Sequence, residues 1–167
     1  MTKATCDGYE FNFTDALNAF TFDDDNKKSQ NFHGLPMKRV DILVEYPDKY
    51  LFIEVKELNP SRYSAATGGG SNRKHTNYTE LVCELKYKYR DSFLFRYAEQ
   101  LVSKEIHYIC LTRFDEALNN SLAMDLQSQI PVGKPSQRWQ IPLVKSCMAI
   151  SFNTWASQFP KWTITKI

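Results

Sequence analysis

The chain has 167 residues, of which 43% are hydrophobic and 24% charged, a composition and length that suit a single globular domain spanning residues 1–167. The net charge of only +2 excludes the strongly basic class of nucleic-acid binders, so a phosphate-binding surface would have to come from local clustering of charge. No apolar run approaches the roughly 18 residues that a membrane span needs. The first ten residues have no apolar stretch typical of a secretory signal, so we expect a cytoplasmic protein without a membrane partner.

Hydrophobic periodicity and the positions of Gly and Pro predict the elements in chain order. They are a helix at 9–22 capped by Asp7, a loop at 23–37, strands at 38–46 and 49–57, a long mobile loop at 59–78, a helix at 79–103, a strand at 105–112, a helix at 115–129, a Pro-rich loop at 131–142, a strand at 145–151, a short helix at 153–159 and a strand at 161–167. Helices and strands that alternate in this way indicate a mixed α/β layer fold.

The two adjacent strands at 38–46 and 49–57 are joined by a turn whose chemistry fixes their register. Residues 46–49 read Tyr-Pro-Asp-Lys, which suits a type I turn because proline fits its second position. Counting back from this turn places Asp41 opposite Glu54. One face of the hairpin is then uniformly aliphatic and is predicted to be core; its members are Ile42, Val44, Leu51, Ile53 and Val55.

The opposite face gathers Asp41, Glu54 and Lys56 at the end away from the turn. Directly opposed side chains have Cβ atoms about 4.5–5.5 Å apart, so the two carboxylates repel each other unless positive charge lies between them. Mg²⁺ is bound by one or two carboxylates together with water and phosphate. A lysine beside such a site can orient the attacking water or stabilise the developing charge. The alternative is that these residues have only a structural role, as a cluster of ion pairs on a solvent-exposed face.

Asp41, twelve intervening residues and then Glu54-Val55-Lys56 in a hairpin resemble the PD-(D/E)XK nuclease superfamily. The resemblance covers roughly residues 9–112, with Arg39-Val40 in place of the proline that often precedes the aspartate. It implies a restriction-endonuclease-like mixed β-sheet flanked by helices, with a short strand before the acid strand at 18–23 or 31–36.

The same resemblance implies hydrolysis of phosphodiester bonds, with DNA as the expected substrate and Mg²⁺ or Mn²⁺ as cofactor. Asp41, Glu54 and the Val55 carbonyl would hold the ion, and Lys56 would position or activate the attacking water. In this superfamily a fourth acid often comes from the first helix, where Glu10 is the first candidate and Asp15 the second; either acid can also be simply a favourable residue near a helix N-terminus. Many members dimerise, so a homodimer is a further expectation.

Basic residues suggest where nucleic acid would bind. The segment 86–90 interleaves lysines and an arginine with tyrosines, and in the superfamily the helix after the E-x-K strand lies beside the active site. We therefore expect DNA contacts from Lys86, Lys88 and Arg90, and from Arg73 and Lys74 in the loop beside three glycines. A solvated helix face and a plain connecting loop are the alternatives.

The four cysteines and three histidines are scattered, with no CxxC pair and no zinc-type spacing, so we expect buried free thiols in a reducing compartment. The main functional rival to the nuclease is a catalytically inactive module of the same fold that binds nucleic acid or a protein. A third reading is an interaction domain with a charged sheet face.

Overall fold

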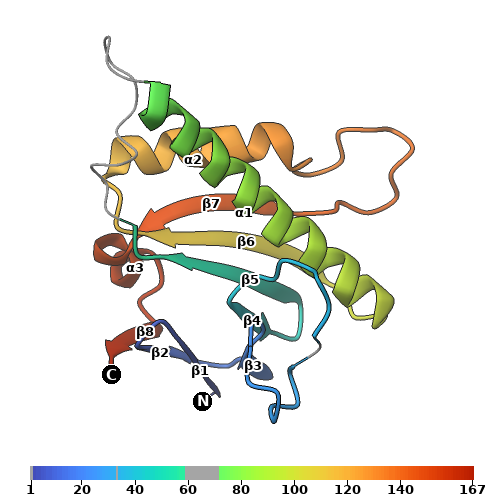
Figure 1. Cartoon of the computed structure of the whole chain (residues 1–167). Coiled ribbons are helices and arrows are strands. Elements are labelled where there is room, and N and C mark those ends of the chain that lie inside the picture. The colour runs from blue at the N-terminus through green and yellow to red at the C-terminus, as the bar shows by residue number, and fades with distance from the viewer. Residues whose placement is uncertain (1, 33, 59–71) are drawn as a thin grey trace.

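The computed structural model describes residues 2–32, 34–58 and 72–167, and the side chains of residues 72–77 lie outside that description. The described chain is a mixed α/β protein with two sheets and three helices (Figure 1). The smaller sheet has the strand order β1-β2-β8, with β1 Thr2–Cys6, β2 Tyr9–Phe13 and β8 Trp162–Lys166. The larger sheet contains β3 Asn18–Thr21, β4 Ile42–Glu45, β5 Lys49–Lys56, β6 Glu105–Thr112 and β7 Ser146–Ser151, in that spatial order.

The larger sheet is antiparallel at one side and parallel at the other. Strands β3, β4 and β5 run antiparallel, whereas β5, β6 and β7 run parallel. Parallel neighbours need long crossover connections. Accordingly, α1 Asn72–Ala98 lies between β5 and β6 in the chain, and α2 Glu116–Gln129 lies between β6 and β7. The remaining helix, α3 Phe152–Gln158, follows β7 directly.

Both faces of the larger sheet are buried, each under a different layer (Figure 1). On one face, Phe52 and Tyr108 pack with Leu85 of α1 and Leu122 of α2. The other face packs against the smaller sheet and α3, through residues that include the predicted aliphatic set Ile42, Val44, Leu51, Ile53 and Val55 and their partners Phe11, Phe13 and Trp155. This burial on both sides explains why the strands are rich in apolar residues.

The hairpin register predicted from the turn is confirmed, because Glu45 pairs with Tyr50 and Leu43 with Phe52. The short strand expected before the acid strand is also confirmed, since β3 pairs with β4. The predictions for α2, the loop at 131–142, β7, α3 and β8 hold to within about two residues. Trp155, Phe159 and Trp162 pack together as expected, with β8 at an edge of the smaller sheet.

The predicted helix at 9–22 is wrong, because this segment forms β2 and β3 instead. Asp7 and Gly8 have φ values of 49° and 78°, and they turn the chain between β1 and β2 rather than capping a helix. An Asp-Gly pair favours a two-residue hairpin because both positions of that turn need positive φ. Tyr9, Phe11 and Phe13 then alternate into the core with the period of a strand.

The prediction of a loop at 59–78 is wrong for residues 72–78, which are helical in α1, and its remainder lies outside the described residues. As a result α1 begins earlier than the predicted helix at 79–103 and ends at Ala98. Of the helices that the structure describes, none combines the length and apolar character that crossing a bilayer requires.

Candidate acid-lysine centre

The structure brings Asp41, Glu54 and Lys56 together at the carboxyl end of β5, as the hairpin register predicts. Asp41 lies just before β4, and its Oδ2 accepts a hydrogen bond of 2.7 Å from the backbone N–H of Val55. Lys56 places its Nζ 2.8 Å from Oε1 of Glu54 and 2.9 Å from Oε1 of Glu84. In open α/β sheets, ligand sites form outside the carboxyl ends of parallel strands, which is where this cluster lies.

Lys88 of α1 stands between the acids. Its Nζ lies 3.1 Å from Oε1 of Glu54, 3.4 Å from Oδ1 of Asp41 and 3.0 Å from Oδ2 of Asp23. The side chain of Lys88 is 11% exposed and that of Glu54 is 0% exposed. One ammonium therefore supplies the positive charge that the two opposed carboxylates need.

Glu54 is the most unusual group of the centre. The ammonium groups of Lys56 and Lys88 are within ion-pair distance, but neither Glu54 oxygen accepts an aligned hydrogen bond from any described residue. A buried carboxylate without hydrogen bonds is costly, since desolvation of the charged form is not repaid locally. Burial, reinforced by the Asp41 carboxylate, accordingly raises the pKa of Glu54 to about 7, against the opposing effect of Lys88 and Lys56.

The neighbouring groups respond to the same environment. Burial raises the pKa of Asp41, although Lys88 and the Val55 N–H act in the opposite direction. For Lys88, burial alone would lower the pKa, but the carboxylates of Glu54 and Asp41 outweigh it and hold the pKa above its usual range. Strongly perturbed groups gathered at one strand end are typical of functional sites.

An outer ring of charge surrounds this centre. Glu84 of α1 bonds Lys56, and Asp23 bonds both Lys88 and the buried Arg39, whose Nη2 lies 3.2 Å from Asp23 Oδ1. Arg39 also donates a hydrogen bond of 2.9 Å to the Phe22 carbonyl. The sequence signals for these residues were an acidic run at 23–25, a basic pair at 38–39, and Glu84 and Lys88 spaced four apart on one helix face.

The predicted fourth acid is not part of the centre. Glu10 lies on β2, where it forms an ion pair of 2.8 Å with Lys3, so that Lys3 lowers its pKa. Asp15, the second candidate, has a positive φ of 63° just after β2. Because residues 9–22 form strands, the helix that was expected to deliver this acid does not exist.

The predicted DNA-contacting residues divide into separate groups. Lys88 faces the acids, whereas Lys86 places its Nζ 4.9 Å from the ring centroid of Tyr87. Arg90 is exposed and donates a hydrogen bond of 3.2 Å to the Gln129 carbonyl. Arg73 and Lys74 lie within α1, but their side chains are outside the described part of the chain.

The centre fits a divalent cation in part. Asp41 and Glu54 lie close enough to share one cation, the ammonium of Lys88. The Val55 carbonyl faces the same side as the Val55 N–H that bonds Asp41, because both backbone groups of a strand residue point to the same neighbouring strand. Two carboxylates and a carbonyl are ligands that Mg²⁺ accepts, with water completing its shell. In residues 2–32, 34–58 and 72–167, however, no group of three or more His, Cys, Asp or Glu side chains is placed to hold a metal.

Cys6 lies close enough to the centre for its acids to affect it. Burial, with Asp41 as the next contributor, raises the pKa of the Cys6 thiol above its usual range, which makes the thiol a poor nucleophile at neutral pH. All four cysteines are free, as expected; Cys110 and Cys147 are buried, and Cys6 and Cys83 are half-buried.

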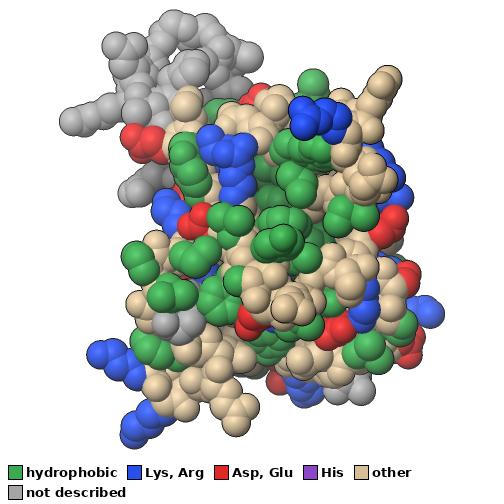
Figure 2. All heavy atoms as spheres, turned by 90° about the vertical axis from the view of Figure 1, so that its right-hand side faces the viewer, with side chains coloured by type: hydrophobic (Ala, Val, Ile, Leu, Met, Phe, Trp, Pro, Cys, Tyr) green, Lys and Arg blue, Asp and Glu red, His purple; other side chains and the backbone are tan. Residues whose placement is uncertain are grey.

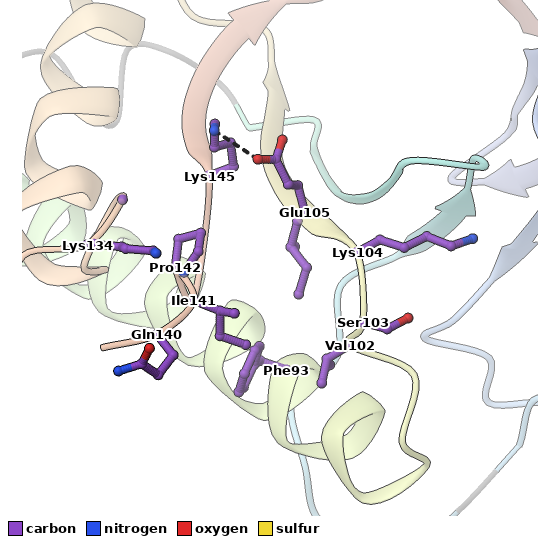
Figure 3. A pocket seen from close by; sticks show the side chains of 12 residues that line it. Phe93, Val102, Ser103, Lys104, Glu105, Lys134, Gln140, Ile141, Pro142 and Lys145 are labelled. Atoms are coloured by element: carbon purple, nitrogen blue, oxygen red, sulfur yellow. Dashed lines mark hydrogen bonds and ion pairs between the residues drawn. The ribbon is translucent and has the colours of Figure 1, made fainter. Parts of the chain in front are cut away.

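A cavity lies at the other end of β6, away from the acids (Figure 3). Its volume is about 610 Å³, and its walls include Phe93, Val102 and Pro142. Two of the charged groups that line it, Lys145 and Glu105, form an ion pair of 2.8 Å with each other. The one acid in the lining of this cavity is Glu105, so the acid-lysine centre lies outside it.

Apolar side chains also gather on the side of the molecule that carries the C-terminal end of α1 and the loop at 131–142 (Figure 2). The exposed large apolar residues of these two segments are Leu94, Tyr97 and Ile141. Surface patches of this kind often serve association. Homodimer formation stays a prediction.

Comparison of the chain with protein-family models, with curated proteins and with solved structures found no match.

Proposed function

We propose that the protein is a metal-dependent nuclease with a restriction-endonuclease-like fold, and that it hydrolyses phosphodiester bonds in DNA. The observation that carries the proposal is Glu54, a fully buried acid that lies with Asp41 and Lys56 at the carboxyl end of β5. The strand order supports the fold assignment, because an antiparallel acid strand and E-x-K strand lead into a parallel pair.

The charge balance favours a cation as part of the working site. The four acids Asp23, Asp41, Glu54 and Glu84 face three cations, Lys56, Lys88 and Arg39, so an incoming phosphate would meet one more negative than positive group. When bound, Mg²⁺ or Mn²⁺ would neutralise charge on the phosphate and lower the pKa of a coordinated water.

The chain's own residues then have distinct roles. Asp41 and Glu54 would hold the ion, and the hydrogen bond from the Val55 N–H fixes the orientation of the Asp41 carboxylate. Lys56 is held by Glu54 on one side and Glu84 on the other, so its ammonium is oriented toward the acids. From this position Lys56 orients the attacking water or stabilises the charge that develops on the phosphate.

The test is cleavage of duplex DNA, single-stranded DNA and RNA with Mg²⁺ or Mn²⁺. We expect wild-type cleavage, no cleavage by Asp41→Ala, and a rate lower by about 10²–10⁴-fold for Lys56→Ala, the range for losing a group that handles protons. Lys49→Ala is the matched control, because Lys49 lies at the other end of the same strand. It should cut like wild type.

The rival function is an inactive module of the same fold. The observation in its favour is that Lys88 already balances the acids without any metal ion. Under this alternative, wild type would cut no substrate with any divalent ion, while DNA or protein binding would be indifferent to Asp41→Ala.

A further inference from the structure

The ammonium of Lys88 occupies the position that a divalent cation would take in order to bind both Asp41 and Glu54. Its ammonium nitrogen is within 3.4 Å of an oxygen of each acid, and Asp23 holds it from a third direction. The lysine is therefore a resident cation of the centre rather than part of the exposed basic surface.

The Lys88 ammonium and a divalent ion cannot bind the same Glu54 oxygen together, because of their distance and their charge. Mg²⁺ binds oxygen ligands at about 2.0–2.1 Å, so an ion on the same Glu54 oxygen would lie within a few ångströms of the Lys88 nitrogen. At that separation, with little water between them, cation–cation repulsion is far stronger than in solvent. Lys56 also lies on this oxygen, at 2.8 Å, so a divalent ion that binds there must displace one of the two lysines.

Lys56 and Lys88 differ in how they are held. Lys56 stands on β5 and is anchored by Glu84, which is independent of the two metal-binding acids. Lys88 has its remaining anchor in Asp23, whose side chain is 32% exposed. Because a lysine has a flexible four-carbon stem, Lys88 can turn past Asp23 toward solvent and remain close to the centre.

We propose that Lys88 closes the cation site in the free protein, is displaced by the divalent ion, and then binds a phosphate oxygen of the nucleic-acid substrate. This inference rests on the proposed function, since it assigns a second working lysine to the same site. It also gives the order of events: metal binding uncovers the lysine that receives the phosphate, so each ligand favours the other.

The displacement can be measured on the wild-type protein without any cleavage assay. Mn²⁺ binding is followed by calorimetry, and lysine exposure by the rate of acetylation at each lysine, read by mass spectrometry. We expect Lys88 to be acetylated at least about tenfold faster at saturating Mn²⁺ than in chelator. Lys86, on the same helix but outside the acid centre, is the internal control and should keep its rate.

A second measurement compares Mn²⁺ affinity between wild type, Lys88→Met and the matched control Lys86→Met. Removing the competing ammonium should tighten binding by about tenfold or more, because the open site is then fully populated. Lys86→Met should bind as wild type does. Circular dichroism and melting curves show whether each variant is folded, and the acetylation result stands on its own if Lys88→Met is not.

The outcomes separate the two proposals. Mn²⁺ binding with Lys88 still protected overturns the displacement, while the metal site of the nuclease survives. Binding by Lys88→Met but not by wild type also overturns the displacement, because the ion then fails to remove this lysine. If neither protein binds Mn²⁺, both the displacement and the metal-dependent function are overturned.

Discussion

Asp41 has a structural role and a proposed metal-binding role, and one pair of substitutions separates them. Its Oδ2 accepts the Val55 N–H at 2.7 Å, and its charge faces Lys88. Asp41→Asn keeps an acceptor for Val55 but removes the charge. Asp41→Ala removes both. Comparing the two variants with each other cancels the effect of the lost charge on Glu54 and Lys88.

The difference in stability between the variants follows from the hydrogen bond alone. Val55 is 2% exposed, and leaving its buried N–H without an acceptor costs about 2 kcal/mol. For a domain of this size each 1 kcal/mol moves Tm by about 2–4 °C, so Asp41→Ala should melt about 4–8 °C below Asp41→Asn. Melting curves in chelator measure this difference.

The metal-binding role appears when the same curves are repeated with about 10 mM Mg²⁺ or Mn²⁺. A site with a dissociation constant of about 1 mM stabilises the native state by about 1.4 kcal/mol at this concentration, or about 3–6 °C in Tm. Wild type should show this rise and both variants should lose it. Equal melting of the two variants would refute the role of the hydrogen bond, and a full metal-induced rise in Asp41→Asn would refute Asp41 as a ligand.

Two further predictions concern parts of the fold away from the centre. Burial, followed by the charge of Lys49, lowers the pKa of His107, while Glu105 acts in the opposite direction. Wild type should therefore lose stability relative to His107→Gln as the pH falls below about 6.5. Melting-temperature curves of the two proteins that run parallel from pH 8 to 5 would count against this reasoning. Phe11 is fully buried and its ring lies 6.1 Å from that of Trp155, so urea denaturation should show Phe11→Ala destabilised by about 3–5 kcal/mol. The exposed Thr165→Ala on β8 should stay within about 0.5 kcal/mol of wild type, and a similar small effect of Phe11→Ala would mean that the smaller sheet is not docked on the larger one.

The register of the hairpin could be predicted because it depends on local chemistry. Proline at position 47 fixes the turn, and the strict alternation of strand side chains carries the register back to Asp41 and Glu54. The same reasoning applied to Asp7 and Gly8 would have predicted β1 and β2. Apolar residues at helical spacing after Tyr9 favoured a helix, and pairing with both β1 and β8 overrode that preference.

The position of Lys88 could not be predicted because it depends on contacts between distant segments. Apolar residues lie nearly all round α1, so the sequence does not show which side faces the sheet. Residues 86 and 90 share a helix face, and residue 88 points roughly the opposite way. Lys88 therefore belongs to the acids of β4 and β5, while Lys86 and Arg90 stay on the outer surface.

The state of Glu54 argues for function over stability as the reason for this centre. Ion pairs that stabilise an interior satisfy their oxygens with hydrogen bonds, because ionic attraction alone rarely repays desolvation. Glu54 has two ammonium groups within ion-pair distance, and burial still raises its pKa to about 7. An apolar residue would fill this position at lower cost, as the buried neighbours Ile53 and Val55 do on the other face. The proposed divalent ion, shared with Asp41, is a ligand whose charge and preferred oxygen atoms match this costly carboxylate.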